Sequence, residues 1–209
     1  MAEPTLHAGA DPVALRTSPL AHLAERMRAA AVTGARGVTL TERPFLTMVN
    51  LCVGPASDAA RRVEKALGAA LPRQCGHTAA SGPHTVIWLG PDEWLVLSGA
   101  DGTALTAGLR KALGADPGSA VDVSANRTTL ELSGPAARQV LEKGCPLDLH
   151  PRAFGPGRAV TTTVGPVAVL LWQTGDDPAY RLLPRASFAD YLARWLIDAM
   201  SEYRGPEVP

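Results

Sequence analysis

Three side chains in the second half of the sequence have the residue types of a nucleophile, its base and an orienting acid. They are Cys145, His150 and Asp148, in the segment CPLDLH. This spacing does not place them on one helix face, and no oxyanion-hole or nucleophile-elbow pattern surrounds them. A cysteine directly after a helix-ending glycine, here Gly144, is usually a small buried apolar residue. We therefore interpret Cys145 as a core residue and predict no nucleophilic catalysis here.

Cys75, His77 and His84 offer three metal-ligand types within one short segment. Zinc loops usually supply two close ligands at each of two points, whereas only Cys75 and His77 form a close pair here. A solvated loop over residues 72–84 explains the same residues without a metal ion. The sequence therefore predicts no metal site on this chain.

Nucleotide-binding and acid–base patterns are also missing. Neither the dinucleotide-binding glycine pattern nor the P-loop occurs, and Gly54-Pro55 and Gly134-Pro135 place a proline where a phosphate needs an N–H donor. The acidic pairs Asp92-Glu93 and Asp176-Asp177 fall in predicted hairpin turns, where carboxylates stay solvated and their pKa values are not tuned by burial. We predict no catalytic residue and no bound cofactor on this chain.

The polar pair Asn126 and Arg127 opens a predicted strand and is placed to bind a ligand or a partner. An Asx turn between two strands explains Asn126 equally well. Arginine outnumbers lysine by 17 to 3, and arginine is favoured in protein contacts because its rigid, weakly hydrated fork suits desolvated pairing. Base composition alone also produces such a bias, so both interpretations of the pair stay open.

The elements that must position these residues follow one pattern twice. Residues 126–132 alternate as in a half-buried strand, Gly134-Pro135 then begins a helix, and Gly144 with Pro146 ends it. Residues 45–53 alternate likewise and precede Gly54-Pro55 and a second helix. A hairpin and a helix follow each copy: 86–89 with 94–97 and then 103–113, and 167–172 with 180–183 and then 187–200. The pattern predicts an α+β fold of duplicated βαββα units, unless this common arrangement occurs twice by coincidence.

We expect a flexible N-terminal arm over residues 1–18, one α+β domain over 19–203 and a C-terminal tail over 204–209. The two pseudo-repeats cover about 37–114 and 119–203, with the segment GADPGS (114–119) between them. The first sheet is expected to begin at Val38-Thr39-Leu40. Trp88 and Trp94 are expected to pair across a hairpin, and Ser187 with Asp190 has the spacing of a capping box.

Composition narrows the class of protein. The chain of 209 residues has 20 basic and 20 acidic side chains, so no net field attracts nucleic acid or an anionic membrane. The three cysteines form no close pair, which indicates a reducing compartment. No secretory signal is present, and the longest apolar stretch is too short to cross a bilayer. We expect a cytoplasmic protein.

The segments SANRTTLELSGPAA and CPLDLHPRAF, with WLGPDEWLVL and the C-terminal region, also carry a resemblance. From about residue 18 to its end the chain resembles the gamma subunits of heterotetrameric bacterial sarcosine oxidase. No general requirement of a fold explains so many neighbouring residue identities. The resemblance implies the fold of the folate-binding domains of the glycine cleavage aminomethyltransferase.

The resemblance also implies a role. This oxidoreductase converts sarcosine and oxygen to glycine and hydrogen peroxide and passes the one-carbon unit to tetrahydrofolate. In the family, FAD and a covalent FMN lie on or beside the beta subunit, NAD and the folate site on alpha, and zinc on delta. Gamma carries no cofactor and packs on alpha. We therefore expect a non-catalytic subunit whose partners are alpha, beta and delta, with direct contact mainly to alpha.

Two other classes of function remain open. One is a stand-alone, folate-binding aminomethyltransferase-like protein, because that fold is shared. The other is an interaction module unrelated to sarcosine. For the subunit, we expect the partner contact to involve the apolar face of the helix after Ser18-Pro19 together with the strand-opening pair; these residues are Leu20, Leu23, Met27, Asn126 and Arg127.

Overall fold

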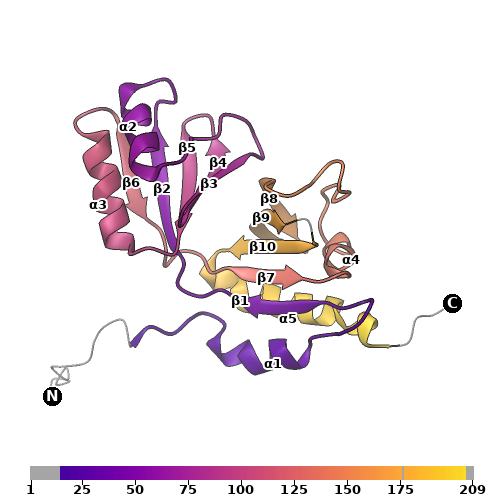
Figure 1. Cartoon of the computed structure of the whole chain (residues 1–209). Helices are drawn as coiled ribbons and strands as arrows, with labels where there is room; N and C mark the ends of the chain where they lie inside the picture. Colours follow the sequence, from indigo (N-terminus) through magenta and orange to yellow (C-terminus); the bar gives the residue numbers. More distant parts are fainter. Residues whose placement is uncertain (1–14, 176, 206–209) are drawn as a thin grey trace, which may run out of the picture.

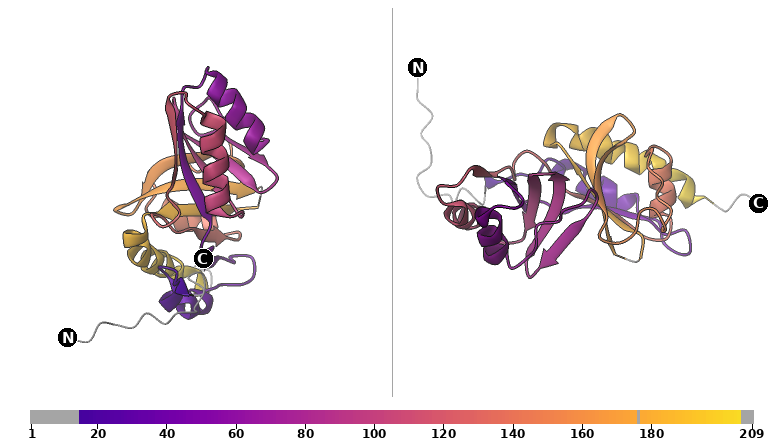
Figure 2. Two further views of the ribbon diagram at one scale, coloured as in Figure 1. Left: turned by 90° about the vertical axis from the view of Figure 1, so that its left-hand side faces the viewer. Right: turned by 90° about the horizontal axis from the view of Figure 1, so that it is seen from above.

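The computed structural model describes residues 15–175 and 177–205, which form two wings that meet near the middle of the molecule (Figure 1). Each wing is built on a five-stranded antiparallel sheet. The first sheet has the strand order β3-β4-β5-β2-β6, and the second has the order β1-β7-β10-β9-β8. Seen from above, the two wings lie side by side (Figure 2).

The first sheet is covered on one face by two helices. Its elements are β2 (Thr47–Val53), α2 (Asp58–Leu67), β3 (Thr78–Ser81), β4 (His84–Gly90), β5 (Glu93–Ser98), α3 (Gly102–Leu113) and β6 (Gly118–Asp122). Helix α2 begins where the Ser57 hydroxyl accepts a hydrogen bond from the Ala60 N–H at 3.1 Å, and it ends at Gly68 with a positive φ of 64°. Apolar residues of β2, among them Val49 and Leu51, pack with both helices in one core.

The second sheet is covered by three helices. Its elements are β1 (Thr39–Glu42), β7 (Leu130–Ser133), α4 (Ala137–Glu142), β8 (Ala159–Val164), β9 (Val167–Gly175), β10 (Ala179–Pro184) and α5 (Ala189–Ala199), with α1 (Ala24–Ala29) from the N-terminal side. Leu130 and Leu132 point from β7 into the core that α1, α4 and α5 share. This agrees with the alternation predicted for that strand.

The duplication is present, but its unit has one strand more than the sequence predicts. Strand β2, helix α2, strands β3, β4 and β5 and helix α3 correspond in order to β7, α4, β8, β9, β10 and α5. The unit is therefore βαβββα. The strands that sequence analysis missed are β3, inside the predicted loop 72–84, and β8. Both lie at sheet edges and lack the alternation of apolar and polar residues by which a strand is recognised.

The two units exchange an edge strand. Strand β1 directly precedes β2 in the sequence but pairs with β7, whereas β6 precedes β7 but pairs with β2. The expectation that Val38-Thr39-Leu40 begins the first sheet is therefore wrong, because these residues lead into the second. The segment 114–119 likewise joins α3 to β6 within the first wing. The chain crosses between the wings at residues 43–46 and at 123–129, and we call the latter the crossover segment.

The two sheets also pack on each other. Met48, Ile87, Leu95 and Leu97 of the first sheet meet Ala159, Leu170, Trp172 and Leu183 of the second in one buried cluster, which we call the inter-sheet core. Backbone contacts continue this junction, since the Ala159 N–H donates to the Gly76 carbonyl at 3.0 Å. Exchange of strands and a shared core tie the wings together.

The structure confirms the predicted hairpins but not the predicted capping box. Both hairpins are present, with Trp88 opposite Trp94. The prediction of a capping box is wrong, because Ser187 makes no capping hydrogen bond. The Asp190 carboxylate instead accepts hydrogen bonds from His22 and Arg194, each at 2.5 Å. Most of the predicted arm (1–18) and tail (204–209) lies outside the described residues. Within the described residues, no helix has the length and apolar content needed to cross a bilayer.

Candidate functional site

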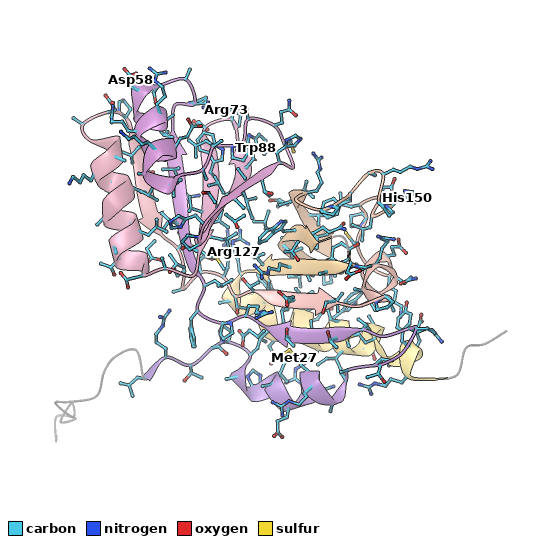
Figure 3. The ribbon with its side chains drawn as sticks, viewed as in Figure 1. Met27, Asp58, Arg73, Trp88, Arg127 and His150 are labelled. Carbon is cyan, nitrogen blue, oxygen red and sulfur yellow. The ribbon has the colours of Figure 1, made fainter. Side chains whose placement is uncertain are left out.

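The crossover segment holds Asn126 and Arg127 at the junction of the two wings, where Figure 3 labels Arg127. The Ala186 N–H donates to the Asn126 carbonyl at 2.8 Å, and Arg127 lies opposite Arg185 in an isolated antiparallel bridge. The Arg127 Nη1 donates to the Leu183 carbonyl at 2.8 Å. The Asx-type turn belongs to Asp122, whose Oδ1 accepts from the Ser124 N–H at 2.9 Å. The backbone at Asn126 is therefore fixed by its bond to the start of the last helix.

Large apolar side chains are exposed in the described residues, and two of them, Phe45 and Val121, line hollows beside this segment. Among the described residues, Leu15, Phe45, Val121, Phe188 and Tyr191 are between 46% and 71% exposed. Phe45 shares a hollow of about 220 Å³ with Arg16 and Arg127, and Val121 lines another of about 270 Å³ with Asn126 and Arg127. Phe188 and Tyr191 follow Arg185 on the last helical segment. We call this region the crossover surface; it comprises Arg16, Phe45, Val121, Asn126, Arg127, Arg185 and, three residues after Arg185, Phe188.

Phe45 has an unusual backbone. Its φ is 60°, a left-handed value that a bulky residue rarely adopts and that costs about 1–3 kcal/mol. The ring lies outside the core, with the Arg16 guanidinium carbon 4.7 Å from its centroid. Residues with strained backbones gather at functional sites, where the surrounding structure holds them in place. An exposed aromatic ring held in this way is typical of a binding surface.

The crossover surface is also basic. Within the described residues, no carboxylate forms an ion pair with Arg16, Arg127 or Arg185. Nearby carboxylates accept from other groups instead: Glu42 from Ser18 and Thr128, each at 2.5 Å, and Asp122 from Ser124 at 2.6 Å. Glu93, which lines the hollow of about 270 Å³ with Arg127, accepts from the Asn50 amide at 2.7 Å. Burial, and then the nearby charge of Arg185, lower the pKa of Arg127. Exposed aromatic rings beside arginines are the composition enriched at protein–protein interfaces.

The other predicted contact residues lie elsewhere. Leu20, Leu23 and Met27 are 0–3% exposed and pack in the core of the second sheet. The expectation that their side chains meet a partner is therefore corrected, because in this chain they bind α1 to its own sheet. Four residues of the crossover surface were not predicted from the sequence, because their residue types do not show that they come together in the fold. These residues are Arg16, Phe45, Arg185 and Phe188.

The residues considered for nucleophilic catalysis do not form a catalytic set. Cys145 is buried, and within the described residues no hydrogen bond joins it to His150. The Asp148 carboxylate accepts from the His150 backbone N–H at 2.9 Å, while His150 Nδ1 accepts from the Arg152 N–H at 3.2 Å. Both side chains therefore shape the loop backbone.

Cys75, His77 and His84 were considered as metal ligands in the sequence. No group of three or more His, Cys, Asp or Glu side chains in the described part of the chain is arranged to hold a metal ion. His84 lies in β4, where its Nδ1 is 3.0 Å from the Ser98 hydroxyl. Glu93 is not in a solvated turn as predicted but begins β5, half-buried, and accepts from the Asn50 amide at 2.7 Å. Asp176 lies outside the described residues.

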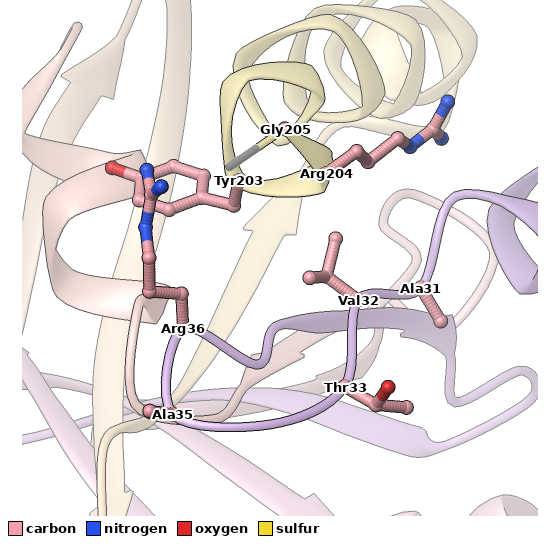
Figure 4. Close-up of a pocket in the computed structure, with 8 residues that line it drawn as sticks. All are labelled: Ala31, Val32, Thr33, Ala35, Arg36, Tyr203, Arg204 and Gly205. Carbon is pink, nitrogen blue, oxygen red and sulfur yellow. The ribbon is translucent and has the colours of Figure 1, made fainter. Parts of the chain in front are cut away.

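A hollow of about 560 Å³ lies between residues 31–36 and the C-terminal turn (Figure 4). Arg36 and Tyr203 line it, with the guanidinium carbon 5.0 Å from the ring centroid. Burial, reinforced by Glu202, raises the pKa of Tyr203 to about 12. This phenol therefore stays protonated at neutral pH and does not serve as a base.

Comparison with known proteins gives a consistent result. Residues 52–202 match the sarcosine oxidase, gamma subunit family. The chain is 49% identical over 199 residues to sarcosine oxidase subunit gamma of Corynebacterium sp. strain U-96, covering 95% of this chain and 96% of that protein. It is 48% identical over 195 residues to the subunit gamma of an Arthrobacter species, covering 93% and 94%.

Solved structures agree. The chain superposes on a chain of the heterotetrameric sarcosine oxidase from Corynebacterium sp. U-96, solved in complex with pyrrole 2-carboxylate, with a TM-score of 0.89 at 48% identity, covering 93% of this chain and 100% of that one. It also resembles glycine cleavage system aminomethyltransferase T from Bartonella henselae, with a TM-score of 0.63 at 16% identity, covering 91% and 62%. This second likeness confirms the predicted fold and concerns the fold alone.

Proposed function

The chain belongs to the sarcosine oxidase gamma subunit family, and on that premise we propose that it works as the gamma subunit of a heterotetrameric sarcosine oxidase. The complex is an oxidoreductase that demethylates sarcosine to glycine with formation of hydrogen peroxide and a folate-bound one-carbon unit. The observation that carries this proposal is similarity to gamma subunits over nearly the whole chain, in sequence and in structure.

In this proposal the chain is a binding subunit and does no chemistry itself. FAD, FMN, NAD and zinc are carried by the alpha, beta and delta subunits, in a cytoplasmic complex. The role fits the site: the crossover surface joins exposed aromatic rings to arginines, whereas Cys145 packs in the core, His150 bonds the loop backbone and His84 pairs with Ser98 across two strands.

The crossover surface is the proposed contact with the alpha subunit, and Asn126 and Arg127 lie at its centre. It lies on linkers and element ends, and the Arg127–Arg185 bridge and the bond from Ala186 to Asn126 tie the crossover segment to the start of the last helical segment. A preorganised surface loses little conformational entropy on binding, which favours stable association. The gamma chain thereby stabilises alpha in the complex.

Co-expression of the four subunits, with and without this chain, tests the proposal. We expect the chain to co-elute with the others in size-exclusion chromatography with mass detection, and the complex to form peroxide from sarcosine. The isolated chain should form none. A chain that elutes alone in the presence of the other three subunits would refute the proposal.

Tetrahydrofolate titration of the isolated chain separates the stand-alone transferase from the subunit. The chain spans only 62% of the aminomethyltransferase that shares its fold. We therefore expect no saturable binding by calorimetry. Micromolar binding would favour the transferase.

A further inference from the structure

Arg127 and Arg185 face each other directly across a two-residue antiparallel bridge. Side chains in such a pair lie about 4.5–5.5 Å apart at Cβ, and like charges there repel. Arg127 is also half-buried, so water screens the repulsion less than at an open surface. The pair is unfavourable in the isolated chain unless an anion lies between or beside the guanidinium groups.

The surroundings indicate which kind of anion fits. Phe45 shares a hollow with Arg127, Val121 lines a second hollow with Arg127, and Phe188 is exposed three residues after Arg185. A free phosphate or a nucleic acid backbone has no apolar group for these rings. A protein segment that combines carboxylates with apolar side chains satisfies both the rings and the arginines.

We propose that the crossover surface binds an acidic and apolar segment of its partner protein, with one carboxylate held jointly by Arg127 and Arg185 and a second near Arg16. The proposal rests on the proposed function, in which that partner is the alpha subunit. A carboxylate accepts from two guanidinium groups at once, so a single Asp or Glu converts the repulsive pair into two charge-assisted contacts. The rings beside it keep water away and strengthen those contacts.

The sharpest test is charge reversal at Arg185 within the purified four-subunit complex. Arg185 is exposed, so Arg185→Glu leaves the core of the chain intact. We expect the dissociation constant of this chain, measured by dilution and mass photometry, to rise by at least about tenfold. Arg185→Lys should raise the dissociation constant less, because lysine keeps the positive charge although it lacks the forked guanidinium group. The salt dependence of dissociation should also weaken in the Glu variant.

Arg16→Glu provides a second variant and Arg152→Glu a matched control. Arg152 is an exposed arginine two residues after His150. Figure 3 shows His150 in the second wing, well away from Arg127. We expect a raised dissociation constant for Arg16→Glu and a change of less than about twofold for Arg152→Glu. Should Arg185→Glu not fold, as judged by circular dichroism, Arg16→Glu decides alone.

Two failures can be told apart. If the wild-type chain joins the complex but the Arg185 and Arg16 variants bind as the Arg152 variant does, the acidic segment is refuted while the subunit role stands. If the wild-type chain does not join the complex at all, the proposed function fails, and this inference fails with it.

Discussion

Replacing Glu131 with glutamine is expected to destabilise the chain at neutral pH and to remove part of its acid sensitivity. Glu131 lies in β7, and its carboxylate joins three elements of the second sheet: the Arg43 Nη2 donates to it at 2.8 Å from the end of β1, and the Arg181 Nε at 3.1 Å from β10. Arg181 also lies over the Trp172 ring, 5.2 Å from its centroid.

The expected magnitude follows from exposure. The Glu131 side chain is 16% exposed, Arg181 28% and Arg43 56%. The largely exposed Arg43 pair contributes about 0.2–1 kcal/mol, and the more buried Arg181 pair about 1.5–3 kcal/mol. Glu131→Gln should therefore lower the free energy of unfolding by about 2–3 kcal/mol, and Arg181→Met should cost more than Arg43→Met.

The pH dependence has a definite sign. Burial raises the pKa of Glu131, but hydrogen bonds and charge from Arg43 and Arg181 outweigh it, so the pKa lies below the ordinary value of 4.5. The stabilisation is therefore fully present above the unfolded-state pKa and is lost as pH falls through the folded-state pKa. The difference in the free energy of unfolding between wild type and Glu131→Gln should stay at about 2–3 kcal/mol from pH 6 to 8 and become smaller below about pH 4.5.

Urea unfolding at a series of pH values, followed by circular dichroism, measures this difference. A double-mutant cycle of Glu131→Gln with Arg181→Met isolates the coupling between the two side chains. The reasoning is refuted if the destabilisation is the same at pH 3.5 as at pH 7, or if Arg43→Met costs as much as Arg181→Met.

Three further predictions concern the inter-sheet core, the strained Phe45 and the exposed thiol of Cys75. Leu183→Ala in the inter-sheet core should cost about 2–5 kcal/mol and keep a single unfolding transition by fluorescence and circular dichroism; separate transitions of the two wings would contradict the shared core. Phe45→Gly relieves the positive φ, so the isolated chain should unfold at equal or higher urea concentration while its binding to the complex weakens; a clear loss of stability would oppose this account. Cys75→Ser should leave peroxide formation by the complex unchanged, whereas lost turnover with the chain still bound would reveal a chemical role for this exposed thiol.

Much of the fold could be predicted because its signals are local. Alternation identified β2 and β7, proline and glycine marked the helices that follow, and the spacing of turn residues revealed both hairpins. Strands β3 and β8 were missed because they carry no alternating pattern and lie at sheet edges, where pairing with a neighbour decides the conformation. Glu93 was misplaced in a turn because only its backbone pairing with Cys52 and Gly90 shows that it belongs to a strand.

The candidate site, too, could be predicted only in part from the sequence. Asn126 and Arg127 stand out by residue type in the sequence, and they lie at the centre of the crossover surface. Leu20, Leu23 and Met27 form an apolar helix face, but such a face packs equally well on the chain's own sheet or on a partner. Their burial in the second core is a property of the assembled fold.

The class of protein, the presence of a duplication and the family could be read from the sequence, because composition, periodicity and runs of matching residues are written in the order of the chain. Only the tertiary structure decided which sheet receives β1 and β6, which apolar faces are used internally, and that Arg127 lies opposite Arg185 beside exposed aromatic rings. The physical reason is that edge pairing and burial depend on contacts between residues far apart in the sequence. The local sequence pattern restricts which strands and apolar faces can pair or pack, but it does not decide which of the possible partners is used.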